Sequence, residues 1–280
     1  MSKIQTAAIA TADERFPSEP ELIDYLSETA GVRAFDNIQS DDNKFTFRDG
    51  PTTYAVSLMN SPISWSQLQT PCANAWYWPE AAPEMQRHVN HIIVGVLDDE
   101  STQIERCLNL SHLTAAVAGN PGIDPVGVLW NPTSGAESLD VTYGLIHRPR
   151  DFVDHCAEIS PLALPLELWI SFLPSQCADG AFLMSTRGLE SFGMKELEMS
   201  VTPEYLLKNR LLTEDQLYRL PEWVYHRMFN FAHYCLDHPV QVKAGETIGM
   251  SEDEKIELVA GFSRFDVNRE ALILNVSRDE

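Results

Sequence analysis

One stretch of the chain constrains the fold more than any other, because it joins two buried strands through a helix. His91–Leu97 (HIIVGVL) is short, apolar and rich in β-branched residues, as a buried strand is. A helical pattern follows from about Ser101 to Ala118, and Gly119–Gly122 ends it before a second apolar run at Val126–Trp130. A strand, a helix and a strand in this order favour a crossover unit, so sheet and helix share one core.

Turn signals and periodicity predict further elements on both sides of this unit. Lys44–Arg48 alternates apolar and polar residues, Asp49-Gly50 is a tight-turn signal, and Thr53–Met59 is extended, which together predict a hairpin. Later strands are predicted at 166–173, 181–186, 196–201, 255–261 and 271–276, and a helical stretch at 203–238 that breaks near Pro221. We therefore predict an α+β fold with mixed sheets and helices packed on one face. Two halves of similar size are expected, 1–150 and 151–280.

The charge balance limits the kinds of partner. The chain has 41 Asp and Glu against 20 Lys and Arg, a formal net charge of −21. Both predicted halves carry an excess of acids and show no basic patch, so we expect no nucleic-acid binding and no membrane binding. An acidic surface keeps a protein in solution and attracts basic proteins, so a basic protein partner is the expectation.

Cysteines and motifs exclude several chemistries. The five cysteines are scattered without a CxxC pair, which argues against a zinc ribbon or a thioredoxin-type site. We find no signal-peptide pattern and no apolar run of membrane-spanning length, so we expect a cytoplasmic protein. The chain contains no GxSxG, Walker, GxGxxG or HExxH motif, so we expect no cofactor.

The eight histidines could in principle hold a metal. His88 and His91 straddle a predicted helix-to-strand junction, and His226 and His233 are two helical turns apart with no suitable ligand between them. We therefore expect structural histidines and no metal. The acidic run Asp98–Glu100 could hold a hard cation, although helix capping explains these acids more simply.

The first candidate contact region is Trp76-Tyr77-Trp78-Pro79. Three successive large rings cannot all face one way on an extended chain. Trp76 and Trp78 therefore either fill a seam between helix and sheet or form a contact surface, and both uses are common.

The second candidate region is the segment 186–198 (TRGLESFGMKELE), which is dense in charge. Gly188 and Gly193 bracket a tight loop between two predicted strands, where positive φ is expected. Glu196 beside Lys195 could act as a catalytic acid, but an ion pair that closes the loop is the simpler interpretation. The candidate binding residues from both regions are Trp76, Trp78, His88, His91, Arg187, Glu196 and Glu198.

The same residues carry a resemblance that spans about Thr52 to Gly249. The chain resembles an uncharacterised bacterial family of domains of unknown function in its WxWP element (Trp76–Pro79) and its GLxxFGMxELE element (Gly188–Glu198). The C-terminal half is also similar to suppressor-of-fused domains, through these strands, Phe231–Tyr234 and Gly245–Ile248. The second resemblance implies a protein-binding module, whose bacterial versions include immunity proteins that neutralise toxins. Neither resemblance implies catalytic residues.

Three functions follow as hypotheses. The first is a non-catalytic protein-interaction module, such as an acidic immunity-type inhibitor of a basic toxin. The second is an enzyme with an unfamiliar site, in which His88 or His91 works with Glu196 or Glu198 as acid and base. The third is a sensor of a small ligand or cation that uses the aromatic segment and Asp98–Glu100.

Overall fold

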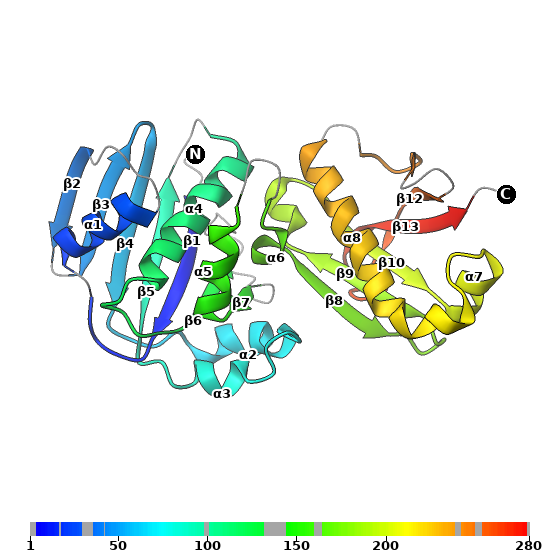
Figure 1. The fold of residues 1–280 in the computed structure, drawn as a ribbon, viewed down its shortest axis with the longest axis horizontal. Coiled ribbons are helices and arrows are strands. Elements are labelled where there is room, and N and C mark those ends of the chain that lie inside the picture. Colours follow the sequence, from blue (N-terminus) through cyan, green and yellow to red (C-terminus); the bar gives the residue numbers. More distant parts are fainter. Residues whose placement is uncertain are drawn as a thin grey trace. The chain divides into compact units, whose positions relative to one another are not determined.

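The fold is known from a computed structural model, which describes residues 4–16, 18–29, 36–41, 43–97, 101–131, 144–159, 164–238, 242–249 and 254–278. The chain divides into two compact units, Met1–Trp169 and Ile170–Glu280, and each unit has its own sheet (Figure 1). Each unit combines helices with an antiparallel or mixed sheet, so the predicted α+β class is confirmed. None of the helices in the described part of the chain combines the length and apolar character that a membrane crossing needs.

The N-terminal unit is built on a seven-stranded antiparallel sheet in the order β2-β3-β4-β5-β1-β6-β7. Its strands are β1 (Ile4–Thr11), β2 (Asp36–Asp41), β3 (Lys44–Asp49), β4 (Thr52–Met59), β5 (Asn90–Leu97), β6 (Pro125–Asn131) and β7 (Leu145–His147). Its helices are α1 (Glu19–Thr29), α2 (Trp65–Asn74), α3 (Ala81–Met85), α4 (Gln103–Ala118), α5 (Pro149–Ala157) and α6 (Leu166–Trp169). The predicted hairpin is β3–β4, and Gly50 in its turn has a φ of 59°.

The predicted crossover runs from β5 through α4 to β6, with one difference in strand order. Both β5 and β6 pair antiparallel with β1, which lies between them, so they run parallel without touching each other. A capping box starts α4: Glu105 N–H donates to Thr102 Oγ1 at 3.3 Å and Thr102 N–H donates to Glu105 Oε2 at 2.7 Å. The crossover is confirmed, but local periodicity carries no information about the strand inserted into it.

The sheet of the N-terminal unit carries helices on both faces, which corrects the prediction of one covered face. Adjacent strand residues point to opposite faces. Leu129 packs in a core cluster with Leu68 of α2 and Met85 of α3. Its neighbour Trp130 contacts Phe152 of α5, with ring centroids 6.0 Å apart. Sheets whose strands are apolar on both faces need cover on both sides, and HIIVGVL already has this composition.

The division between the units falls later in the chain than the predicted point near Asp151. Helix α5 packs on α4 and β6 of the N-terminal unit, and α6 packs on β7. Trp169, at the end of α6, donates from Nε1 to Ser111 Oγ of α4 at 2.9 Å. Helices α5 and α6 therefore complete the first core.

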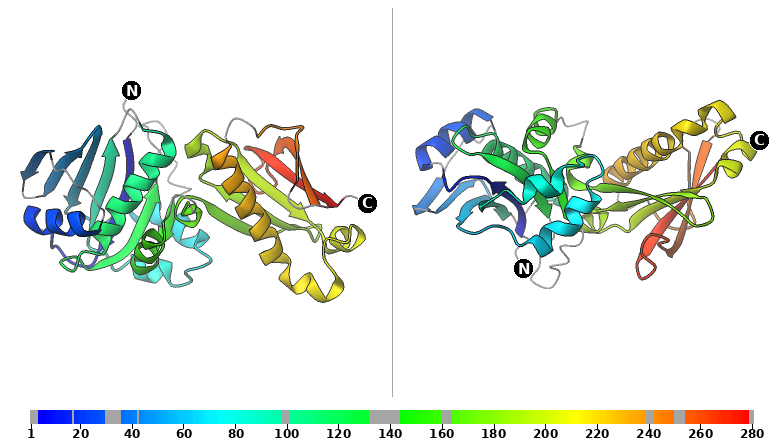
Figure 2. Two further views of the ribbon diagram at one scale, coloured as in Figure 1. Left: turned by 45° about the horizontal axis from the view of Figure 1, so that its top comes forward. Right: turned by 90° about the horizontal axis from the view of Figure 1, so that it is seen from below.

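The C-terminal unit is built on a mixed sheet, which Figure 2 shows from two sides. Its six strands lie in the order β11-β12-β13-β10-β9-β8. Its strands are β8 (Ser171–Gln176), β9 (Phe182–Arg187), β10 (Glu196–Val201), β11 (Thr247–Gly249), β12 (Glu254–Phe262) and β13 (Glu270–Arg278). Its helices are η2 (Leu189–Phe192), α7 (Pro203–Lys208), η3 (Glu214–Arg219) and α8 (Leu220–Asp237). Helix α8 packs against β9 and β10.

Most predicted elements of this unit are confirmed. The strand prediction for 196–201 coincides with β10, and the break near Pro221 is the start of α8. The strand predicted at 166–173 is wrong in its first half, where α6 forms one short turn before β8. Leu166, Leu168 and Trp169 are all buried, so the apolar residues of this stretch reflect burial of a short helical turn and not strand periodicity.

A buried histidine gives the N-terminal unit a predictable response to acid. His147 of β7 lies between Tyr77 and Phe152, with ring centroids 6.2 Å and 5.5 Å away. Burial lowers the pKa of His147 to about 3, although a hydrogen bond with the backbone of Leu168 opposes the shift. Between the unfolded pKa of about 6.5 and this folded value, the unfolded chain binds the extra proton, so stability falls as the pH falls.

We expect wild-type protein to lose about 2 kcal/mol more unfolding free energy than His147→Gln between pH 6.5 and 5. The variant lacks the group that must stay neutral in the core. Urea unfolding at the two pH values measures the difference. Equal losses in the two proteins would contradict the assignment.

Candidate functional site

The WYWP segment contains one core tryptophan and one surface tryptophan. It forms the turn between α2 and α3, where Trp78 N–H donates to Ala75 O at 2.8 Å. Trp78 is 1% exposed and packs in the cluster that contains Met85. Trp76 is 55% exposed and meets Tyr77 edge-on, with ring centroids 5.8 Å apart. In a turn, unlike in a strand, successive side chains point in unrelated directions. Of the two predicted uses, Trp78 therefore has the core position and Trp76 the surface position.

His88 and His91 fasten one turn to the sheet. His88 Nε2 accepts a hydrogen bond from Ile63 N at 2.7 Å and its Nδ1 is hydrogen-bonded to Met85 O, so both ring nitrogens are engaged. His91 Nδ1 donates to Ser61 O at 2.7 Å, and burial lowers the pKa of His91. Both side chains therefore tie backbone segments together in this part of the unit.

The described residues contain no group of three His, Cys, Asp or Glu side chains placed to hold a metal. Asp98–Glu100, the predicted cation site, lies outside the described residues.

Thiol chemistry at neutral pH is disfavoured for the four buried cysteines. Burial raises the pKa of Cys72 to about 11 and those of Cys107, Cys156 and Cys235 to about 12. A thiol with such a pKa stays protonated and is a poor nucleophile at pH 7. These side chains behave as small apolar core residues.

The charged segment 186–198 lies where two loops of the C-terminal unit meet. Strand β10 pairs antiparallel with β9 and parallel with β13. Strand β13 also pairs antiparallel with β12. The β9–β10 loop and the β12–β13 loop are therefore at the same end of the sheet. Two side chains at the start of β10, Glu196 and Glu198, reach one loop each.

Glu196 holds the β9–β10 loop. Its Oε2 accepts from Thr186 Oγ1 at 2.7 Å, and its Oε1 accepts from the backbone N–H of Gly188 at 2.8 Å and of Glu190 at 3.3 Å. Gly188 and Gly193 have φ values of 123° and 76°, which confirms the predicted positive φ. Burial raises the pKa of Glu196, while these three hydrogen bonds and the charge of Arg187 oppose the shift.

Glu198 holds the β12–β13 loop. Its Oε2 accepts from Ser263 Oγ at 2.5 Å and its Oε1 accepts from Arg264 N at 2.8 Å. Ser263 Oγ in turn accepts from the backbone N–H groups of Phe265 and Asp266, both at 3.0 Å. One carboxylate and one hydroxyl therefore fix four consecutive residues of this loop.

Arg187 lies beneath the second loop. Its Nη1 donates to Ser185 Oγ at 2.9 Å and to Thr186 O at 2.7 Å, and its Cζ lies 5.1 Å from the ring centroid of Phe265. The Phe265 ring thus packs over a buried cation.

These positions correct the predicted contact surface. Trp78, His88, Arg187, Glu196 and Glu198 are all at most 8% exposed, and only Trp76 among the seven candidates is mainly exposed. The buried carboxylates of Glu196 and Glu198 have hydrogen-bond partners, and the density of charge in a sequence does not distinguish this case from a surface cluster. Arg187, Glu196 and Glu198 support a surface of the C-terminal unit and do not form it.

The surface that they support is apolar. Phe262, Phe265 and Val267 are 66%, 39% and 72% exposed at the end of β12 and in the following loop, and we call these three residues the hydrophobic tip. Ion pairs join the tip loop to the neighbouring loop: Arg269 to Glu190 at 3.5 Å and Lys195 to Glu270 at 2.7 Å. The sequence signal for this surface is the presence of apolar residues between the predicted strands 255–261 and 271–276, where a turn is usually polar. The prediction of candidate binding residues does not include them.

Comparison with known proteins bears on this region. The model of a family described as "Domain of unknown function (DUF4261)" matches residues 216–272, which include α8, β12 and the hydrophobic tip. This finding agrees with the predicted likeness to an uncharacterised domain. Neither the curated proteins nor the solved structures contain a match to the chain.

Proposed function

We propose that this protein is a non-catalytic, cytoplasmic protein-interaction module that docks on a basic protein through the hydrophobic tip. The observation that carries the proposal is the way the tip is held. Buried Glu198 and Ser263 fix the loop from beneath while Phe262 and Val267 remain mainly exposed. An apolar surface that is ordered before binding loses little conformational entropy when a partner covers it, which favours affinity.

The charges favour a basic partner. The net charge of −21 attracts a basic protein over long range, and exposed carboxylates of Glu190 and Glu270 flank the tip. Arg269 and Lys195, which lie nearby, already pair with these acids. The attraction of a basic partner therefore rests on the net charge of the whole chain. The resemblance to suppressor-of-fused domains supports a binding role.

An acid–base role for Glu196 and Glu198 has less support. The oxygens of both carboxylates accept hydrogen bonds from the protein's own loops, and both side chains are at most 1% exposed. His88 likewise has both ring nitrogens engaged. A general acid or base must reach a substrate proton, and these groups face the protein interior.

The proposal predicts that the double variant Phe262→Ser/Val267→Ser loses the partner while the fold persists. Both side chains are mainly exposed, so the stability cost is expected within about 0.5 kcal/mol each. Removing apolar anchors from the centre of an interface typically weakens binding by about 2 kcal/mol or more, roughly thirtyfold. Affinity capture from cells that produce the protein natively, followed by calorimetry with the purified partner, measures this loss.

The matched control is Tyr218→Ser, which removes an 81% exposed ring elsewhere in the same unit. This variant should bind the partner as wild type does. The partner should be basic, and its association rate should fall as salt rises from about 0.05 M to 0.5 M, because salt screens the attraction. Undiminished binding by the double variant would count against the tip as the docking site.

A further inference from the structure

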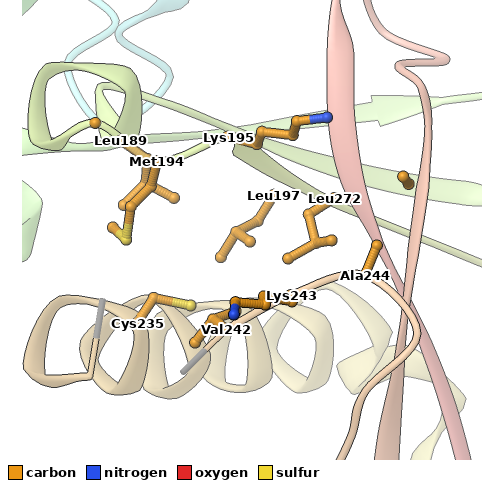
Figure 3. A pocket seen from close by; sticks show the side chains of 11 residues that line it. Leu189, Met194, Lys195, Leu197, Cys235, Val242, Lys243, Ala244 and Leu272 are labelled. Atoms are coloured by element: carbon orange, nitrogen blue, oxygen red, sulfur yellow. The ribbon is translucent and has the colours of Figure 1, made fainter. Parts of the chain in front are cut away.

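A pocket of about 300 Å³ lies between the C-terminal sheet and α8. Figure 3 shows Leu197 and Leu272 pointing from the sheet across this pocket, with Cys235 of α8 and Val242 on the far side. Leu189 and Met194 of the β9–β10 loop also line it. Its volume is at the lower end of the range for small-molecule sites, roughly 300–1,000 Å³.

The walls of the pocket are held by hydrogen bonds. The turn that follows Val242 is tied to β12, because Gly245 N–H donates to Leu258 O at 2.7 Å and Leu258 N–H donates to Glu246 O at 2.9 Å. Lys243 N–H also donates to Glu246 Oε2 at 2.9 Å. On the other side, Glu196 fixes the β9–β10 loop as described above. Hydrogen bonds within the chain therefore hold both of these walls in place before any ligand binds.

The charged side chains that line the pocket are basic, although the protein as a whole is acidic. Lys195 and Lys243, two of the chain's six lysines, line this pocket. Among the described residues that line it there is no Asp or Glu, although acids outnumber bases by 41 to 20 in the chain. Lys195 is paired with Glu270 at 2.7 Å. Within the described part of the chain, Lys243 forms no ion pair. A cation at the edge of an apolar pocket favours an anionic group there.

We propose that this pocket binds a small amphipathic carboxylate, an aliphatic acid of about the size of octanoate. The hydrocarbon tail lies against Leu197, Leu272 and Val242, where it buries apolar surface. The carboxylate meets the ammonium group of Lys243 at the rim. The hydrophobic tip does not line this pocket, so this proposal stands or falls independently of the docking proposal.

Calorimetric titration of the full chain with octanoate at pH 7 tests the proposal. We expect one site per chain, and binding weakened roughly tenfold in Lys243→Gln, because a charge-assisted contact contributes about 1.5 kcal/mol or more. Lys208→Gln removes an exposed lysine that does not line the pocket and should leave binding unchanged. Octanol, which has the same tail without the charge, should bind more weakly than octanoate.

A second variant tests the location. Ala260→Leu places a larger side chain at a position that lines the pocket and should abolish octanoate binding while the melting temperature stays near that of wild type. Where that variant melts early, Ala244→Leu on the opposite wall makes the same test. The proposal is overturned if wild type does not bind octanoate at millimolar concentration. It is also overturned if Lys243→Gln binds as wild type does, or if the folded pocket-filling variant still binds.

Discussion

Replacing Glu198 with alanine is expected to cost the C-terminal unit about 3–5 kcal/mol of unfolding free energy. The carboxylate is 0% exposed and accepts from Ser263 Oγ and Arg264 N, so its removal leaves buried donors without an acceptor. Urea unfolding measures the loss, and amide hydrogen exchange at Arg264 and Phe265 should become faster as the tip loop is released.

Glu257→Ala is the matched control, because Glu257 is an exposed glutamate in β12 of the same sheet. Its effect should stay within about 0.5 kcal/mol. Glu198→Gln, which keeps one acceptor oxygen, should fall between the two. Comparable stability of Glu198→Ala and Glu257→Ala would show that the buried carboxylate does not hold the loop.

Replacing Trp78 with alanine is expected to destabilise the N-terminal unit by about 3–5 kcal/mol. The ring is 1% exposed and fills the core between the α2–α3 region and the sheet. Packing there is tight, because even a methyl group added at Gly127 would collide with Met85 and touch Trp78. Truncation therefore leaves a cavity that rigid neighbours cannot close.

Trp76→Ala provides the control within the same segment. Its ring is 55% exposed, so the expected change is within about 0.5 kcal/mol. Denaturant unfolding of both variants, with the same probe, gives the comparison. A similar cost for the two substitutions would contradict the division of the WYWP segment into a core ring and a surface ring.

The sequence predicts the elements of this fold well where a local pattern determines them. The β3–β4 hairpin follows from Asp49-Gly50, and β10, β12 and β13 follow from apolar alternation between turns. The insertion of β1 between β5 and β6 depends on pairing between segments far apart in the chain. No local pattern records such pairing, which is why the crossover was predicted but its strand order was not.

The candidate site was predicted in part. The segment 186–198 was identified as unusual, and its glycines and charged residues do form one network. Arg187, Glu196 and Glu198 of this segment were predicted to form a contact surface, but they are buried. Residue type cannot show whether Glu198 faces solvent or a loop that lies 65 residues later in the chain. The hydrophobic tip went unnoticed because exposed apolar residues resemble core residues in a sequence.

Photo-crosslinking from the tip tests the central claim most directly. A benzoylphenylalanine placed at position 262 in the full chain, irradiated in cells that produce the protein natively, should form one covalent adduct with a basic protein. The same probe at position 218, which is also exposed, should form none. The account predicts an adduct that appears only from position 262 and weakens as salt rises. The absence of an adduct at 262, or equal labelling from both positions, would contradict docking through the hydrophobic tip.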